Sequence, residues 1–136
     1  MTTTTTGKPE RSKPDPKELG RRGEAFAVGW LSARGYTVVA RNWRCSLGEV
    51  DVVAHHEGDL VAVEVKTRSG VGYGAPAEAV TGEKLARLHR LALSFARETS
   101  QGEPPTTRRR VDVLSLIWPP GDPVPCSVDL YRAVTP

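Results

Sequence analysis

Hydrophobic and polar residues alternate in two neighbouring runs of the chain, over residues 49–55 and 60–67. Alternation with a period of two is typical of half-buried β-strands. The dipeptide Glu57-Gly58 lies between the runs, and a polar pair ending in glycine is typical of a tight hairpin loop. The pattern therefore predicts a β-hairpin in which Val52 lies opposite Val63.

This register divides the hairpin side chains between two different faces. One face is apolar throughout and carries Val50, Val52, Ala54, Val61, Val63 and Val65. The other face places Asp51 opposite Glu64 and Glu49 opposite Lys66. Opposed like charges destabilise a sheet, and a bound divalent cation would reverse that repulsion. Because carboxylate oxygens suit Mg²⁺ or Mn²⁺, we hypothesise that this face holds a metal ion. An ordinary solvated face of an edge hairpin is the alternative.

Before these runs, from about Pro16 to Arg34, apolar residues recur with the period of a helix. The apolar and small residues of one helix face are Leu19, Gly23, Phe26, Ala27, Trp30 and Leu31. Glu24 lies at the border of this face, where a solvent-exposed carboxylate is the simpler interpretation. Gly20, Gly23 and Ala27 predict a close approach of the helix backbone to another element. Gly35 is expected at the position just after the C-cap.

A second helix is predicted from about Thr81 to Thr99, with Thr81 as its N-cap. Leu85, Leu88, Ala92, Phe95 and Ala96 form its apolar stripe. Lys84, Arg87 and Arg90 lie along another side. This side is either a solvated cationic face or a contact for a phosphate backbone.

The remaining strands are predicted over residues 36–44, 111–117 and 126–134, with the last at a sheet edge. The strand over 111–117 includes Asp112, a carboxylate that needs a partner there. The element order predicts an α/β sandwich with a mixed sheet of about five strands and helices on its faces. The strand after the second helix is expected to run parallel to residues 60–67.

Length and composition indicate the class of protein. The chain has 136 residues and a net charge of +3. Residues 1–17, with a threonine run and three prolines, predict a disordered tail, and residues 18–136 predict a single domain. No apolar run reaches the length that spans a bilayer and no signal-peptide pattern is present. We therefore expect a cytoplasmic protein without a membrane partner.

Two further patterns argue against other cofactors. Cys45 and Cys126 lack the spacing of a structural zinc site. Residues 70–75 match the glycine pattern of dinucleotide-binding turns, but Pro76 stands where the helix should be running, and no strand ending in an acidic residue lies about 20 residues further on, as a ribose contact requires. We expect no nucleotide cofactor. The mild positive charge permits a nucleic-acid partner without requiring one.

Several motifs together resemble a known family. Asp51 followed by Glu64-Val65-Lys66 resembles the Asp…Glu-x-Lys motif of the restriction-endonuclease-like nuclease superfamily. The wider set is similar to the YraN-like family: Leu19-Gly20-Arg21-Arg22-Gly23-Glu24, Ala40-Arg41-Asn42-Trp43-Arg44, Gly48-Glu49-Val50-Asp51, Val63-Glu64-Val65-Lys66-Thr67-Arg68, Ala75-Pro76-Ala77-Glu78-Ala79-Val80 and Arg110-Val111-Asp112-Val113. One departure is Val50, since proline precedes the aspartate in many superfamily members.

The resemblance implies a restriction-endonuclease-like fold and a metal-dependent DNA endonuclease. The family is similar in fold to archaeal-type Holliday junction resolvases, which points to branched DNA or recombination and repair intermediates as substrates and, more faintly, to a homodimer. The residues carried over as catalytic are Glu24, Asp51, Glu64 and Lys66; those as Mg²⁺ or Mn²⁺ ligands are Asp51, Glu64 and Glu24; and the expected nucleic-acid contacts are Arg21, Arg22, Arg44, Arg68, Lys84, Arg87 and Arg90. Glu49 is expected to support the site.

Two alternatives stay open at this point. The first is a nucleic-acid-binding module of the same fold that does not cleave efficiently. The second is a structural or adaptor protein whose charged cluster only stabilises a loop. Asp51→Asn separates the second alternative from a metal site, because only the structural role predicts that this change destabilises the metal-free fold.

Overall fold

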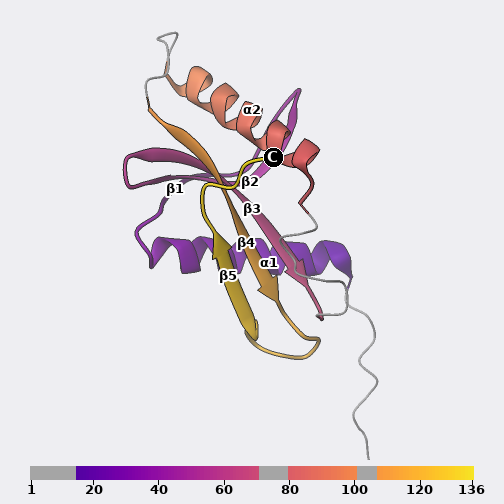
Figure 1. The fold of residues 1–136 in the computed structure, drawn as a ribbon. Coiled ribbons are helices and arrows are strands. Elements are labelled where there is room, and N and C mark those ends of the chain that lie inside the picture. The colour runs from indigo at the N-terminus through magenta and orange to yellow at the C-terminus, as the bar shows by residue number, and fades with distance from the viewer. Residues whose placement is uncertain (1–14, 71–79, 101–106) are drawn as a thin grey trace, which may run out of the picture.

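Five strands form one mixed sheet in chain order. In the computed structural model, which describes residues 15–70, 80–100 and 107–136, the elements are α1 (Pro16–Ser32), β1 (Thr37–Cys45), β2 (Gly48–His56), β3 (Asp59–Arg68), α2 (Gly82–Thr99), β4 (Arg109–Ile117) and β5 (Ser127–Tyr131). The strand order is β1-β2-β3-β4-β5 (Figure 1). β3 and β4 are parallel and the other neighbours antiparallel. The predicted α/β fold is confirmed, and it is consistent with a restriction-endonuclease-like fold.

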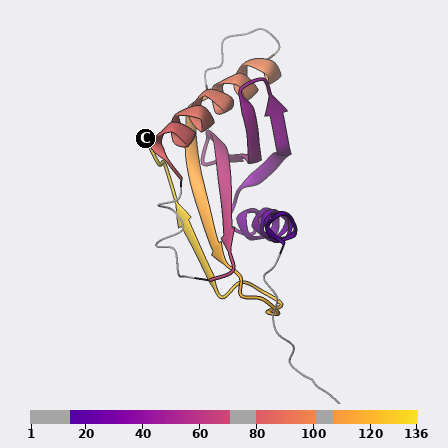
Figure 2. The same cartoon turned by 90° about the vertical axis from the view of Figure 1, so that its right-hand side faces the viewer.

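The two helices cover opposite faces of this sheet (Figure 2). One core cluster joins the apolar stripe of α2, including Leu88 and Phe95, to Leu60 and Ala62 of β3. The other joins Ala27 and Leu31 of α1 to the alternate side chains of the same strands. Successive side chains of a strand point to opposite faces, so β3 supplies both cores, and residues 60–65 are all buried.

A side-chain cap begins each helix, and the cap of α2 is the predicted Thr81. Asp15 caps α1 by accepting a hydrogen bond from the Lys17 N–H, and Thr81 caps α2 by accepting one from the Lys84 N–H. The predicted role of Gly35 just after the end of α1 is confirmed. Gly35 has a left-handed φ of 90°, its N–H donates to the Ser32 carbonyl, and the Tyr36 N–H donates to the Leu31 carbonyl, which is the Schellman pattern of a helix end.

Gly23 brings α1 into close contact with β3. A Cβ atom at Gly23 would lie 1.9 Å from the Oγ1 atom of Thr67, so only glycine allows this approach. Ala27 is fully buried, as the close-approach prediction requires. For Gly20 the prediction is wrong, since a Cβ atom there meets no atom within 4 Å.

The predicted hairpin register is confirmed over its central part. Val52 pairs with Val63, and the pairing continues to His56 and Asp59. Glu57 and Gly58 have φ values of 51° and 83°, which is the conformation of a two-residue type I′ loop.

Two predicted segments lie outside the described residues. They are residues 1–14 of the expected tail and residues 71–75 of the glycine-rich segment. Pro16 and Lys17, at the end of the expected tail, already belong to α1. Among the described residues, no helix combines the length and the apolar character needed to cross a membrane.

Candidate active site

Strands β2 and β3 stop pairing at the point where the predicted carboxylates begin. The ladder ends at Val52 and Val63, so Asp51 and Glu64 are not a cross-strand pair as expected. Instead, the Oδ2 atom of Asp51 accepts a hydrogen bond from the Val65 N–H at 2.8 Å. The Asp51 side chain therefore spans the gap between the diverging strands and replaces a backbone acceptor.

The side-chain alternation of β1 and β2 shifts at this same point. Val50 and Val53, three residues apart, both pack in the α2 core, whereas Val52 packs in the α1 core. The prediction that Val50 shares a face with Val52 is therefore wrong. Between the paired positions Arg41–Val52 and Trp43–Val50 lie Asn42 and Asp51.

Asn42 lies at this shift and has an unusual backbone conformation. It has a left-handed φ of 48°, a conformation that asparagine tolerates better than most residues. The irregular backbone interrupts the alternation of β1 in the same place as that of β2, where Ala40 and Trp43 pack in the α2 core. Sequence reasoning did not assign Asn42 to the site, because an asparagine inside a strand pattern gives no signal of its own.

Three carboxylates affect one another at this point. Burial raises the pKa of the Asp51 carboxyl to about 8, and the charge of Glu64 adds to the rise. The hydrogen bond from the Val65 N–H lowers the pKa of Asp51, the charge of Glu24 raises it, and the charge of Lys84 lowers it. Glu64 is itself only 4% exposed. The charges of Glu24 and Glu64 therefore both act on Asp51, although Asp51 and Glu64 are not a cross-strand pair.

Glu24 reaches the site from α1 and has a partner there. Its Oε1 atom accepts a hydrogen bond from the Asn42 side-chain amide at 2.9 Å. The tight contact of the neighbouring Gly23 with Thr67 sets the distance of this helix turn from β3. Glu24 of α1 is thus held by Asn42 of β1, beside the point where Asp51 lies between β2 and β3.

Two ammonium groups flank Glu64. Lys84 of α2 lies 3.3 Å from the Oε2 atom of Glu64, and Lys66 lies 3.9 Å from the same atom. Lys66 was expected at the site. Lys84 was expected only as a nucleic-acid contact, and its place beside Glu64 depends on how α2 crosses the sheet.

Of the other predicted nucleic-acid contacts, Arg21, Arg22 and Arg87 contact residues other than these carboxylates. Arg21 pairs with Glu18, and Arg22 stacks 4.4 Å from the Trp118 ring centroid. Arg87 lies over Gly48 at the β1–β2 turn, Arg90 is exposed, and the Arg68 carbonyl accepts from Trp118.

Glu49 is paired with Arg44 rather than with Lys66. The Arg44 Nη2 atom donates to Glu49 Oε1 at 3.0 Å, and the two residues are partners in the β1–β2 register. The expected opposition of Glu49 and Lys66 is wrong because β2 and β3 have already diverged at this level.

The donor set fits a hard divalent cation, with two carboxylates as its core. Asp51 and Glu64 supply only oxygen atoms, and their mutual repulsion is of the kind that a cation relieves. Among the described residues, no group of three carboxylate, imidazole or thiol side chains converges closely enough to hold a metal ion. Glu24 would therefore have to move, or act through water, to become a third donor.

Comparison with known proteins places the chain in a family. The model of the uncharacterised protein family UPF0102 matches residues 23–116, which include all four residues expected to be catalytic. The chain belongs to the UPF0102 family. This is the YraN-like family whose motifs the sequence resembles, so the predicted membership is confirmed.

Curated members of the family resemble this chain closely. A UPF0102 protein of Clavibacter michiganensis is 50% identical over 105 residues, covering 77% of this chain and 86% of the relative. One from Arthrobacter is 52% identical over 99 residues, covering 73% and 81%. One from Roseiflexus castenholzii is 48% identical over 98 residues, covering 72% and 77%.

Proposed function

We propose that this protein is a Mg²⁺- or Mn²⁺-dependent endonuclease that hydrolyses phosphodiester bonds in DNA. The observation that supports the proposal is the pairing of the half-buried Asp51 carboxylate with the buried Glu64 carboxylate, with Lys66 and Lys84 beside Glu64. Fold stability alone gives no reason to withdraw two mutually repelling carboxylates from water, because burial of a charge is costly unless it is compensated.

The chain's own residues divide the chemical work. Asp51 and Glu64 would hold the cation, with Glu24 positioned by Asn42 as a further oxygen donor. When bound, the cation polarises a phosphoryl oxygen and lowers the pKa of a water molecule. Lys66 would orient the attacking water or stabilise negative charge developing on the phosphoryl oxygens.

The resemblance to resolvases supports branched DNA, such as recombination or repair intermediates, as the substrate, and a homodimer as the acting form. The alternative function is a nucleic-acid-binding module of the same fold without efficient cleavage. The lack of a converging three-ligand group among the described residues favours this alternative.

A cleavage panel tests the proposal. Labelled duplex, single-strand, flap and four-way-junction DNAs are incubated with Mg²⁺, Mn²⁺ or chelator. The proteins are the wild type, Glu64→Gln and Glu83→Gln, all prepared identically. Glu83 is an exposed carboxylate in the first turn of α2 and serves as the matched control.

We expect metal-dependent cutting by the wild type and by Glu83→Gln, fastest on branched DNA, and loss of cutting in Glu64→Gln. Equal cutting by all three proteins would show a contaminant and overturn the proposal. Binding of DNA by all three without cleavage would establish the binding module.

A further inference from the structure

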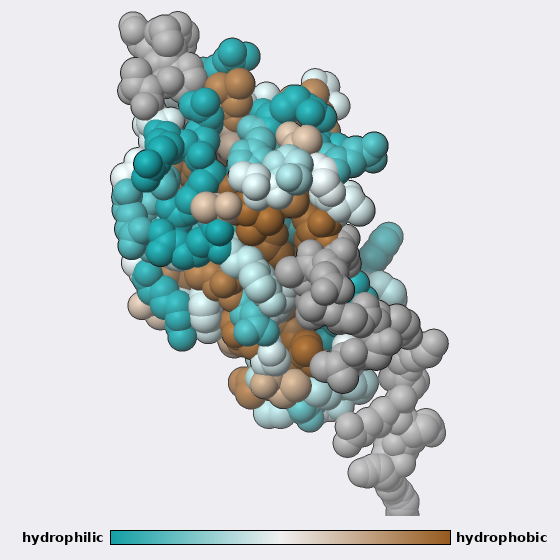
Figure 3. Space-filling model, in the orientation of Figure 1, coloured by the Kyte–Doolittle hydropathy of each residue, from teal (hydrophilic) through white to brown (hydrophobic). Residues whose placement is uncertain are grey.

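A second polar site lies away from the carboxylates, around an open pocket of about 630 Å³. Three segments distant in the sequence line it, together with His89 of α2: the β2–β3 turn, the first residues of β4 and the C-terminal segment. The charged residues of the lining are Glu57, Asp59, Arg108, Arg109, Arg110 and Arg132. Hydrophilic residues gather on the left-hand side of the view in Figure 3, over the region where β4 begins.

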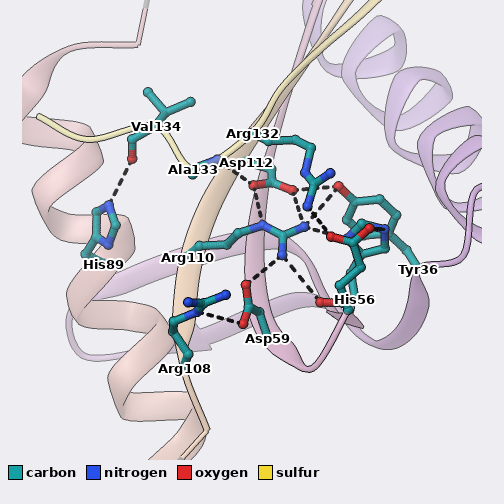
Figure 4. A network of polar contacts seen from close by, with 11 residues as sticks. Tyr36, His56, Asp59, His89, Arg108, Arg110, Asp112, Arg132, Ala133 and Val134 are labelled. Atoms are coloured by element: carbon teal, nitrogen blue, oxygen red, sulfur yellow. Dashed lines mark hydrogen bonds and ion pairs between the residues drawn. The ribbon is translucent and has the colours of Figure 1, made fainter.

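The wall of this pocket is built on a buried ion network. Arg110 is 7% exposed and lies between two carboxylates (Figure 4). Its Nε and Nη2 atoms donate to Asp112 at 3.0 and 3.1 Å, and its Nη1 atom donates to Asp59 at 2.9 Å. Burial disfavours the charged form of Arg110, but the hydrogen bonds that it donates to Asp112 and Asp59 raise the pKa of Arg110 above its ordinary value. Asp112 thus has the partner that its strand position requires.

The same network holds the C-terminal segment in place. Asp112, which is fully buried, also accepts hydrogen bonds from the Tyr36 hydroxyl at 2.6 Å and from the Ala133 N–H at 3.0 Å. The Val134 carbonyl accepts from His89 at 3.0 Å. Ala133 and Val134 are therefore bonded to β4 and α2, which places the C-terminal segment at the wall of the pocket.

The cations of the pocket exceed its anions. Asp59 forms an ion pair with Arg108 through one oxygen and with Arg110 through the other, and Glu57 forms an ion pair with Arg132. Among the residues that the structure describes, no carboxylate pairs with Arg109, which donates to the Thr107 carbonyl. Arg108 uses only its Nε atom on Asp59, and its side chain is 82% exposed. Outward-facing guanidinium donors from Arg108 and Arg109 thus remain for a ligand.

We propose that this pocket binds a phosphate group of the nucleic-acid substrate, at a distance from the bond that is cut. Arginine forks match two oxygens of a phosphate in one plane. The volume lies within the usual range for ligand pockets, about 300–1,000 Å³. This proposal rests on the proposed function, because it assigns the pocket to the same substrate.

The position of the pocket suits such a second contact. Arg109 pairs with Leu60, and Glu64 follows four residues later on β3. At about 3.3 Å per residue, the two sites are roughly 13 Å apart along the sheet. Since phosphates of one strand advance about 3.4 Å along a duplex axis, this distance corresponds to about four nucleotides.

The test measures DNA binding without cleavage. All proteins carry Glu64→Gln and are kept in chelator, and a labelled flap DNA is titrated at several salt concentrations. Arg109→Gln and Arg108→Gln each remove one pocket donor. Arg97→Gln, an exposed arginine in the last turn of α2, removes the same charge outside the pocket. Thermal unfolding verifies that each variant is folded.

We expect each pocket variant to bind the flap more weakly and to lower the slope of log affinity against log salt by about one, with Arg97→Gln unchanged. Equal effects of Arg109→Gln, Arg108→Gln and Arg97→Gln would overturn the proposal. A pocket that binds inorganic phosphate, while both pocket variants bind the flap normally, would also overturn it and assign a free anion instead.

A further readout separates this proposal from the proposed function. On the active background, Arg109→Gln should raise KM for DNA and leave kcat unchanged. If the wild type proves inactive but the pocket variants lose DNA binding, the nuclease fails and the phosphate site stands.

Discussion

The Oδ2 atom of Asp51 lies 2.8 Å from the backbone nitrogen of Val65 and accepts its hydrogen bond, in a position where β2 no longer pairs with β3. The carboxylate thus serves as a sheet acceptor while it lies beside Glu64. This double role explains why Asp51 is held in place despite the burial and the like charge that raise its pKa to about 8.

The first prediction concerns stability and pH. Because the pKa of Asp51 is higher in the folded state than in the unfolded chain, its contribution to stability is fully present below about pH 4 and is lost as the pH rises through about 8. Asp51→Asn keeps an oxygen acceptor for Val65 and cannot ionise. In chelator, the wild type should lose up to a few kcal/mol relative to Asp51→Asn between pH 5 and pH 9, measured by urea unfolding. A constant difference across this range would contradict the prediction.

The second prediction concerns metal addition. Mg²⁺ or Mn²⁺ should raise the melting temperature of the wild type, because a ligand that binds only the folded state stabilises it by about 1.4 kcal/mol at roughly ten times its Kd. Glu64→Gln should remove most of this shift, and Glu83→Gln should retain it. A shift of the same size in Glu64→Gln would show that the ion binds elsewhere.

Lys84 should oppose metal binding. Its ammonium lies 3.3 Å from Glu64 and lowers the pKa of Asp51, so it repels a cation at the same carboxylates. Lys84→Ala should bind Mn²⁺ more tightly than the wild type in the absence of DNA, whereas Lys84→Arg should remain close to it. Calorimetric titration measures both, and weaker binding by Lys84→Ala would exclude this role.

The fourth prediction concerns the packing of α1 on β3. Gly23→Ala should destabilise the fold by about 1–3 kcal/mol, because the new methyl group meets Thr67. Gly20→Ala should stabilise it by about 0.5–1 kcal/mol, because the site is open. Chemical denaturation measures both changes, and Thr67→Ala combined with Gly23→Ala should recover part of the loss as a double-mutant cycle. Equal effects at the two glycines would show that α1 does not approach β3 closely.

The fifth prediction concerns the buried network. Tyr36→Phe removes the hydroxyl that donates to Asp112 at 2.6 Å, a bond to a charged acceptor that contributes about 1.5–3 kcal/mol. Urea unfolding should show a loss of this order. Tyr131→Phe, at an exposed ring, is the control and should change stability little. No loss in Tyr36→Phe would mean that Arg110 and Ala133 alone satisfy Asp112.

Features that depend on near neighbours could be predicted from the sequence. The alternation around Glu57-Gly58 predicted the register of Val52 with Val63, because the side-chain period and the loop length determine it locally. Asp51 and Glu64 could be proposed for the same reason. The element order and the motif set predicted the α/β fold and the family.

Other features were decided only by the tertiary structure. The β2–β3 ladder ends before Asp51, where the Asp51 carboxylate accepts the Val65 N–H, and the left-handed backbone of Asn42 lies beside this point in β1. Neither feature alters the sequence pattern. The contact of Lys84 with Glu64 depends on the crossing of α2 over the sheet. The network around Arg110 joins residues up to 76 positions apart. The sequence by itself determined the strands, the helices and the types of side chain available, because periodicity and capping act over a few residues. Packing alone decided which charges share one buried space, because that depends on contacts between segments far apart in the chain.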